Sequence, residues 1–190
     1  MILPIEKGHF LYESGHHSDQ WIRLELLFLQ PERIRPLADD LADRLSKYVI
    51  DAVCGPLVEG AFVALTVASR IGVAFTYAER SENPIAYRIP GALRREVSGR
   101  RIAIVNDVIS AGSAVRGTFA DLTTCGAQTV VVGALTVLGD AFPQFAAENN
   151  LALETLEQLP NQIWMPAECP LCAAGVQLED LARIQSPQRH

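Results

Sequence analysis

Long hydrophobic runs are absent from this 190-residue sequence. No apolar stretch reaches the roughly 18 residues that a membrane-spanning helix needs, so we expect no such helix and no membrane partner. Residues 1–7 also lack the basic start and the long apolar middle of a signal peptide. We therefore expect a cytoplasmic protein.

An excess of positive charge is absent as well. The chain has 16 Lys and Arg residues against 22 Asp and Glu residues, which gives a net charge of −6. A surface for nucleic-acid backbones relies on clustered Lys and Arg, so we expect no nucleic-acid partner. A local site for a small anion stays open, because five arginines lie close together in the sequence: Arg88, Arg94, Arg95, Arg100 and Arg101.

Cysteine is scarce, with four residues. Cys54 and Cys125 lie among apolar neighbours and are typical of small core residues. Cys169 and Cys172 have the spacing of metal ligands or of a redox pair. One pair supplies only half of a four-ligand zinc site, so the other half has to come from elsewhere, for example the same pair in a second subunit. A metal-free turn and a disulfide or redox pair are the alternatives.

Disorder is not indicated, because 49% of the residues are hydrophobic and 20% are charged. The length and composition predict a single domain over residues 1–190. Between Ile34 and Tyr48, apolar residues recur at spacings of three and four with charged residues between them. This pattern predicts an amphipathic helix over 31–48, with Pro31 near its start.

Short apolar segments and helix-like segments alternate after this helix. The predicted strands are 50–54, 73–78, 102–105, 129–138 and 151–159, and the predicted helices are 59–71, 114–125 and 141–149. Residues 80–99 are polar and indicate a long loop or a small hairpin, and the last twenty or so residues look irregular. Nearly continuous apolar strands separated by helices predict an α/β fold, with a parallel sheet covered on both faces. Ligands of such folds bind beyond the carboxyl ends of the strands.

The segment 101–118 is the most informative part of the chain. Its apolar strand ends in Asn106 and Asp107, and a turn of small residues then leads into a helix. Loop N–H groups and the helix dipole make such a turn an anion site, and Asp107 adds an acceptor for sugar hydroxyls or a divalent metal. The pattern suits a phosphorylated ribose. The alternative is an ordinary crossover whose small residues serve packing.

This segment resembles the phosphoribosyl-diphosphate (PRPP) signature of type I phosphoribosyltransferases, which is a strand, two acidic residues and a Thr/Ser/Gly loop. Asn106 stands where the first acid is expected, and Ala114 stands where the loop often ends in Ser or Thr. The resemblance implies a three-layer parallel sheet with a small hood built from about residues 1–30 and the C-terminal tail. It also implies that PRPP is bound by Asn106, Asp107, Ser110, Ala111, Gly112, Ser113 and Ala114.

A second segment follows the strand at 50–54 and opens the helix at 59–71. It looks like the pyrophosphate-binding loop of the same family. The resemblance implies a role for Gly55, Pro56, Leu57, Val58, Glu59 and Gly60. The alternative is a strand-to-helix turn that needs Gly55 and Pro56 for its geometry.

Residues 8–21 resemble the N-terminal hood of orotate phosphoribosyltransferases. The residues implied in the base pocket are Phe10, Ser14 and Gly15. The alternative is a surface hairpin in which His16 and His17 have no role. Adjacent residues of a strand point to opposite sides, so these two histidines are not an obvious metal pair. Residues 168–179 look like the tail of some bacterial and archaeal members.

The resemblance thus runs from about residue 8 to residue 179. It implies transfer of ribose 5-phosphate from PRPP to orotate or a related base, for pyrimidine nucleotide biosynthesis. It implies Mg²⁺ bound with PRPP, without direct ligation by the protein, small-molecule substrates and a homodimer. Asp107 and Arg88 are the implied catalytic residues, and further positive charge near the pyrophosphate would come from Arg80, Arg94 or Arg95.

Three features of the sequence depart from the family pattern. Residues 80–99 contain neither Lys nor His, which the family's mobile catalytic loop usually carries. Asn106 removes one negative charge, and residues 136–140 lack the Arg that commonly meets the orotate carboxylate. Two alternatives therefore stand beside the orotate enzyme: a PRPP- or nucleotide-binding regulatory protein that has lost catalysis, and a phosphoribosyltransferase for a different base.

Overall fold

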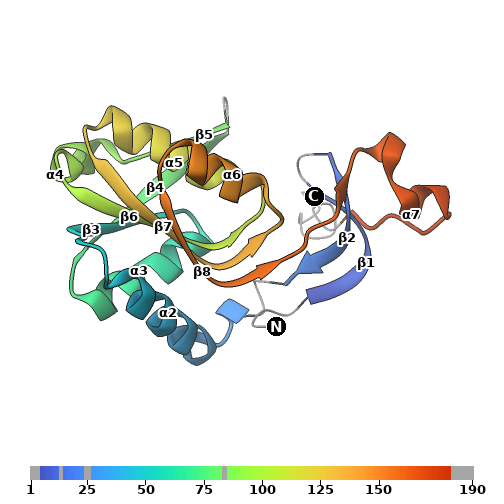
Figure 1. Cartoon of the computed structure of the whole chain (residues 1–190), viewed down its shortest axis with the longest axis horizontal. Coiled ribbons are helices and arrows are strands. Elements are labelled where there is room, and N and C mark those ends of the chain that lie inside the picture. The colour runs from blue at the N-terminus through green and yellow to red at the C-terminus, as the bar shows by residue number, and fades with distance from the viewer. Residues whose placement is uncertain (1–4, 13–14, 24–26, 83–84, 181–190) are drawn as a thin grey trace, which may run out of the picture.

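The structure, a computed structural model, describes residues 5–12, 15–23, 27–82 and 85–180. These residues form a six-stranded sheet flanked by helices and a separate three-stranded sheet beside it (Figure 1). None of the helices in these ranges has the length and hydrophobicity needed to cross a membrane.

The six-stranded sheet has the order β5-β4-β3-β6-β7-β8. All neighbouring strands run parallel except β4 and β5, which form an antiparallel hairpin. The strands are β3 (Ala52–Pro56), β4 (Ala74–Glu82), β5 (Ile85–Arg88), β6 (Arg101–Ile109), β7 (Gln128–Leu138) and β8 (Ala152–Leu159). The predicted mainly parallel α/β sheet is confirmed.

Helices cover both faces of this sheet, as Figure 1 shows. The helices α2 (Pro31–Leu45) and α3 (Glu59–Ile71) cover one face, and their buried residues share a hydrophobic cluster with Val105 and Leu135. The helices α5 (Ser113–Thr124) and α6 (Ala141–Glu148) cover the other face, in a cluster with Ile102 and Ile104. Residues of one strand thus serve both clusters, because successive side chains point to opposite faces.

Several predicted boundaries differ from the structure; for example, the strand predicted over 73–78 is observed as Ala74–Glu82. The first helix ends at Leu45 instead of residue 48, and a turn follows it. The strand predicted over 102–105 continues to Ile109, because residues 106, 108 and 109 pair with β7. Asn106 and Asp107 therefore lie inside the last part of β6. Residues 80–99 contain the β4–β5 hairpin and two short helices, η1 (Gly91–Leu93) and α4 (Arg94–Val97).

The second sheet has the order β1-β2-β9 and joins the two ends of the described chain. Its strands are β1 (Ile5–Leu11), β2 (His17–Ile22) and β9 (Ile163–Trp164), all antiparallel. Two short helices follow, η2 (Pro166–Glu168) and α7 (Pro170–Ala173). The chain then returns to β1, where the Glu179 N–H donates to the His9 carbonyl at 2.7 Å and the Leu11 N–H donates to the Glu179 carbonyl at 3.0 Å.

Candidate functional site

A cavity of about 560 Å³ is lined by residues of both sheets. The residues from the six-stranded sheet and its loops, here called the loop wall, are Asn106, Val108, Ser110, Ala111, Gly112, Ser113, Ala114 and Leu138. The residues from the three-stranded sheet and its turn, here called the hood wall, are Tyr12, His16, Trp21, Ile22 and Ile163. The cavity lies at the carboxyl ends of β6 and β7, where ligands of parallel sheets are expected.

The loop wall is built around the turn that joins β6 to α5. Gly112 has φ +78°, and a Cβ at this position would lie 2.2 Å from Cδ2 of Phe142. Only glycine satisfies both constraints without strain. The first N–H groups of a helix have no partner inside it, so the start of α5 offers donors and a positive dipole end. This wall can therefore bind an anion such as a phosphate.

Side chains hold this turn in place. Arg116 donates from Nε to the Ala111 carbonyl at 2.9 Å and from Nη2 to the Ala141 carbonyl at 3.0 Å. Nδ2 of Asn161 lies 3.1 Å from the Ser110 hydroxyl oxygen and donates to it. The turn is thus braced by contacts from both sides, so a ligand meets donors that are already arranged.

Asp107 lies beside the cavity without lining it. Its residue is only 6% exposed. Burial raises the pKa of the Asp107 carboxyl to about 7; the negative charge of Glu59 also raises it, while hydrogen bonds from the backbone of Val108 and of Asp107 itself oppose the rise. Its neighbour Asn106 does line the cavity, and Asn106 Nδ2 donates to the Val108 carbonyl at 2.8 Å.

The turn between β3 and α3, residues 55–60, packs against this end of β6. A Cβ on Gly60 would lie 2.0 Å from Oδ1 of Asn106, and one on Gly55 would lie 2.6 Å from Cα of Ala61. Both glycines are therefore required by close approach. The Leu57 N–H donates to the Ala78 carbonyl at 2.9 Å, and the Leu57–Val58 peptide bond is cis. The structure thus brings the two predicted loops together.

Two of the predicted arginines bind a buried carboxylate. Arg88 Nη1 lies 3.0 Å from Asp121 Oδ1, and Arg94 Nη1 lies 2.7 Å from Oδ2, which also accepts from the Ile89 N–H at 2.8 Å. Burial raises the pKa of the Asp121 carboxyl, but these three donors outweigh it and lower the pKa below its usual value. Neither these arginines nor Arg80 or Arg95, on β4 and α4, are among the described residues that line the cavity.

The predicted base-pocket residues have different positions. Phe10 is 1% exposed, and its ring lies 6.2 Å from that of Trp21, so it supports the hood wall from behind. Gly15 occupies an exposed turn with φ +78°, outside the cavity lining. Ser14 lies outside the described residues. The aromatic residues Tyr12 and Trp21, which sequence reasoning missed, face the cavity instead. Their amphipathic rings in a polar segment are the signal that could have indicated them.

The last predicted pair, Cys169 and Cys172, lies outside the cavity lining. Both cysteines are free thiols. Their sulfur atoms lie close to ring nitrogens of His9 and His17 in the same chain. A pair from a second subunit, considered above as one source of the other ligands, is therefore not needed to complete a set of four.

Comparison with known proteins decides the family. No protein-family model matches the chain. An orotate phosphoribosyltransferase from Caldanaerobacter subterraneus subsp. tengcongensis is 31% identical over 174 residues, which cover 92% of this chain and 88% of that protein. The chain belongs to the orotate phosphoribosyltransferase family. The family predicted from the sequence is thereby confirmed.

Solved structures agree with this family. An orotate phosphoribosyltransferase from Aeropyrum pernix has a TM-score of 0.65 at 18% identity, over 81% of this chain and 87% of that one. An adenine phosphoribosyltransferase from Thermoanaerobacter pseudethanolicus has a TM-score of 0.59 at 17% identity, over 73% of this chain and 88% of that one. At these identities the likeness shows the fold alone, and the two names show that the fold itself does not select the base.

Proposed function

We propose that this member of the orotate phosphoribosyltransferase family transfers ribose 5-phosphate from PRPP to orotate, with release of pyrophosphate, in pyrimidine nucleotide biosynthesis. One observation carries the proposal: an anion-binding turn and an aromatic wall face each other across one cavity, with Asp107 and the 55–60 turn beside it. This arrangement fits a substrate that has a phosphate at one end and a planar base at the other.

Each part of the site has a proposed role. The N–H groups of the turn at 110–114 hold the 5′-phosphate, and the 55–60 turn holds the pyrophosphate. Asp107 accepts hydrogen bonds from the ribose hydroxyls, with the Asn106 amide beside it. Tyr12 and Trp21 offer ring faces against which a base can stack.

The reaction replaces the bond from C1 of the ribose to pyrophosphate by a bond to a ring nitrogen of the base. Orotate is already anionic, so little acid–base chemistry is needed, and positioning and charge stabilisation carry most of the catalysis. The two walls would hold donor and acceptor in one cavity. The contacts of Arg88 and Arg94 with Asp121 favour a positioning role for these arginines.

Mg²⁺ accompanies PRPP in this proposal. The site fits such a cation, because Asp107 is a buried carboxyl whose ionisation is opposed by burial and by the nearby charge of Glu59. Carboxylate and amide oxygens, including that of Asn106, are the hard donors that Mg²⁺ prefers. Asp107 and Asn106 would help to hold PRPP together with its cation, which would offset the charge of the leaving pyrophosphate.

The test is turnover of orotate. With PRPP and Mg²⁺ present, the absorbance of orotate is expected to fall while an equal amount of pyrophosphate forms, and omission of either addition is expected to stop both changes. No consumption of orotate at saturating PRPP and Mg²⁺ would reject the orotate assignment. If PRPP still binds in calorimetry but no base is turned over, the regulatory alternative replaces it.

A different base is the second candidate, and the lining of the cavity favours it. Among the described residues that line the cavity there is neither Lys nor Arg. Leu138, which lines it, belongs to the segment 136–140, which lacks the Arg expected from the family resemblance. A buried carboxylate without a partner is costly, so orotate needs another donor such as His16. A panel of free bases with PRPP, including uracil and adenine beside orotate, decides between the two by their kcat/KM values.

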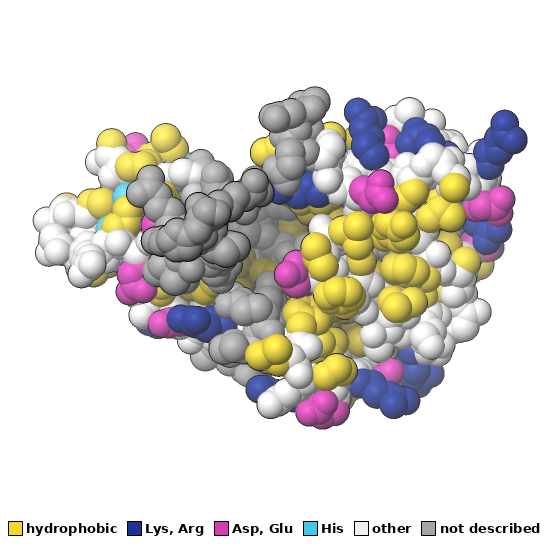
Figure 2. All heavy atoms as spheres, turned by 180° about the vertical axis from the view of Figure 1, so that it is seen from behind, with side chains coloured by type: hydrophobic (Ala, Val, Ile, Leu, Met, Phe, Trp, Pro, Cys, Tyr) yellow, Lys and Arg dark blue, Asp and Glu magenta, His cyan; other side chains and the backbone are white. Residues whose placement is uncertain are grey.

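A homodimer is part of the proposal. Hydrophobic side chains gather on one face of the molecule (Figure 2). The start of α3 exposes Val58, Phe62 and Leu65, with exposures of 54%, 49% and 51%, which is unusual for side chains of this size in water. Sedimentation of the wild-type chain is expected to give a dimer, and Phe62→Asp is expected to shift it toward the monomer.

A further inference from the structure

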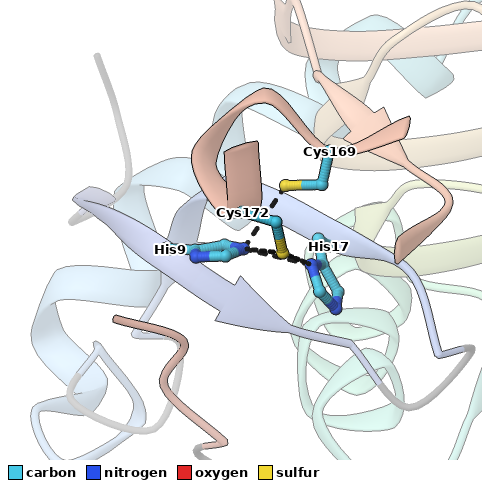
Figure 3. A group of neighbouring side chains, drawn as sticks. All are labelled: His9, His17, Cys169 and Cys172. Atoms are coloured by element: carbon cyan, nitrogen blue, oxygen red, sulfur yellow. Dashed lines mark hydrogen bonds between the residues drawn. The ribbon is translucent and has the colours of Figure 1, made fainter. Parts of the chain in front are cut away.

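Four side chains converge behind the hood wall, on the side away from the proposed reaction. His9 lies on β1 and His17 begins β2, while Cys169 and Cys172 belong to the turn and short helix of the C-terminal segment. Figure 3 shows their ring nitrogens and sulfur atoms directed toward one another. Taking one nitrogen or sulfur from each residue, all four atoms lie within 4.8 Å of one another.

The spacing of these atoms is that of a coordination shell. His9 Nε2 lies 3.0 Å from His17 Nδ1, 3.3 Å from Cys169 Sγ and 3.8 Å from Cys172 Sγ, which is itself 3.3 Å from His17 Nδ1. Around a tetrahedral Zn²⁺ with bonds of roughly 2.0 Å to nitrogen and 2.3 Å to sulfur, ligand atoms are about 3.3–3.8 Å apart. Small adjustments of the side chains would place all four at bonding distance from one ion.

The orientation of His9 supports this interpretation. Its other ring nitrogen, Nδ1, lies 2.9 Å from the Val176 carbonyl oxygen, which can only accept, so Nδ1 carries the proton. In the neutral ring, Nε2 then presents a lone pair to the cluster. Metal-binding histidines are commonly oriented in this way by a carbonyl or carboxylate on the second nitrogen.

Hydrogen bonds alone do not account for every close contact in the cluster. The Nε2 lone pair of His9 can accept one good hydrogen bond, yet His17, Cys169 and Cys172 all direct an atom at it. If Cys169 donates to it, the 3.0 Å contact between His9 Nε2 and His17 Nδ1 is left without a full hydrogen bond; if His17 donates, the Cys169 thiol loses this acceptor. A cation removes the conflict, because all four atoms then act as donors of electron pairs.

Burial and charge agree with a metal. His9, His17 and Cys169 are 1%, 5% and 3% exposed, so their polar atoms have little access to water. Two thiolates neutralise a divalent ion, so a Zn²⁺ site of two cysteines and two histidines buries no net charge. Cys172 is exposed and gives an incoming ion a route to the cluster. Thiolate with imidazole is a donor set that selects zinc over Mg²⁺ or Ca²⁺.

We propose that His9, His17, Cys169 and Cys172 form a structural Zn²⁺ site that fastens the C-terminal segment to the β1–β2 hairpin. Four protein ligands close the coordination shell, which is the mark of a structural ion, since a catalytic zinc keeps a position open. The site holds the hood wall from behind and does not take part in the transfer reaction. It is independent of the identity of the base.

The test begins with metal content. The full chain is produced without a histidine tag and purified without chelator, and mass spectrometry of the elements is expected to find one zinc per chain. Cys169→Ser and His17→Asn are each expected to lower this value at least tenfold. Cys125→Ser is the matched control, because it removes a half-buried thiol at the end of α5 and is expected to retain one zinc.

A second measurement uses the wild-type chain and so does not depend on how the variants fold. Zinc is removed with a chelator under reducing conditions and replaced by Co²⁺. The intense visible bands of tetrahedral Co²⁺, with thiolate charge-transfer bands in the near ultraviolet, are expected at one Co²⁺ per chain. The weak spectrum of octahedral Co²⁺, failure to bind either ion, or a Cys169–Cys172 disulfide in the freshly purified chain would each overturn the proposal.

Discussion

The two sheets of the molecule are held together by different kinds of contact. The six-stranded sheet lies between two clusters of buried apolar side chains, one on each face. In the three-stranded sheet, β1 and β2 bury the polar residues His9, His17, Ser18 and Gln20 along with Phe10. A small sheet with so few fully buried apolar side chains gains little from the hydrophobic effect, so it depends on specific polar contacts and, in our proposal, on zinc.

The difference extends to the cavity, because each sheet supplies one wall. The loop wall belongs to the six-stranded sheet with its apolar core and offers backbone donors. The hood wall offers aromatic side chains on the β1–β2 hairpin, which in our proposal is fastened by zinc. We therefore expect changes near the loop wall to alter phosphate chemistry or the stability of the whole domain. Changes in the small sheet should alter base binding and local stability.

The strongest test of the loop wall is Asp107→Asn. Loss of the carboxylate that meets the ribose is expected to lower kcat/KM at least about a thousandfold, measured by orotate consumption. A variant that kept a tenth of the wild-type kcat/KM would show that Asp107 does not have this role in the transfer reaction.

At high pH, the same variant should be more stable than the wild-type protein. The folded-state pKa of Asp107 is raised from 3.8 to about 7, so its stabilising protonated form is fully present below about pH 4 and is lost as the pH rises through 7. Asn cannot ionise, so denaturant unfolding at pH 8 without PRPP is expected to show a gain of about 4 kcal/mol in the free energy of unfolding, since a pKa difference of one corresponds to about 1.4 kcal/mol. The gain should shrink toward zero near pH 4, which serves as the control.

Asp121→Ala tests the polar contacts of the large sheet. This buried carboxylate binds Arg88, Arg94 and the Ile89 N–H, so its loss is expected to reduce the free energy of unfolding by about 3 kcal/mol. Asp51→Ala is the matched control: it breaks the more exposed pair with Arg101 and should cost clearly less. Equal losses in urea unfolding would show that burial does not distinguish the two pairs.

Removal of zinc should act on the small sheet alone. Chelation under reducing conditions is expected to speed amide exchange at least tenfold in residues 5–11, 17–22 and 163–179, because the ion that would connect these segments is removed. Amides of β6 and β7 should exchange as before. Hydrogen exchange with mass spectrometry measures both regions at once, and a uniform increase would mean that the two sheets unfold together.

Trp21→Ala should have the smallest effect. Removal of one ring face from the hood wall is expected to raise the KM of the base about fivefold, equivalent to about 1 kcal/mol of stacking. The KM of PRPP should stay unchanged, because the phosphate-binding turn lies on the other wall. Initial rates at varied concentrations of base and of PRPP give the two KM values separately. A rise in the KM of PRPP alone would show that the hood wall binds PRPP and not the base.

Local patterns explain which parts of this structure could be predicted. The helix at 59–71 was predicted with its observed bounds, because its small and apolar residues form a continuous helical pattern between clear turn signals. The extension of β6 to Ile109 was missed, since pairing with β7 overrides the polar character of Asn106 and Asp107. The alternation of strands and helices, which needs no distant contact, predicted the parallel sheet correctly.

Contacts between distant residues could not be predicted in the same way. His9 and Cys169 are separated by 160 positions, and no local pattern records that they meet. The sequence indicated half of a metal site at Cys169 and Cys172 but had no means to show where the rest lay. For the same reason Tyr12 and Trp21 were not recognised as cavity residues, since the opposite wall of the cavity, at residues 106–114, lies far from them in the sequence.

The pairing of β2 with β9 has a consequence for the order in which the protein is made. His17 pairs with Trp164, and Ile163 lines the cavity, so the hood wall is not complete until nearly all of the described chain has been synthesised. The helices and strands of the large sheet are complete by Leu159 and are linked by shorter loops, so they can form earlier. A nascent chain at that stage would expose to solvent the turn proposed to bind phosphate, before the wall proposed to bind the base was complete.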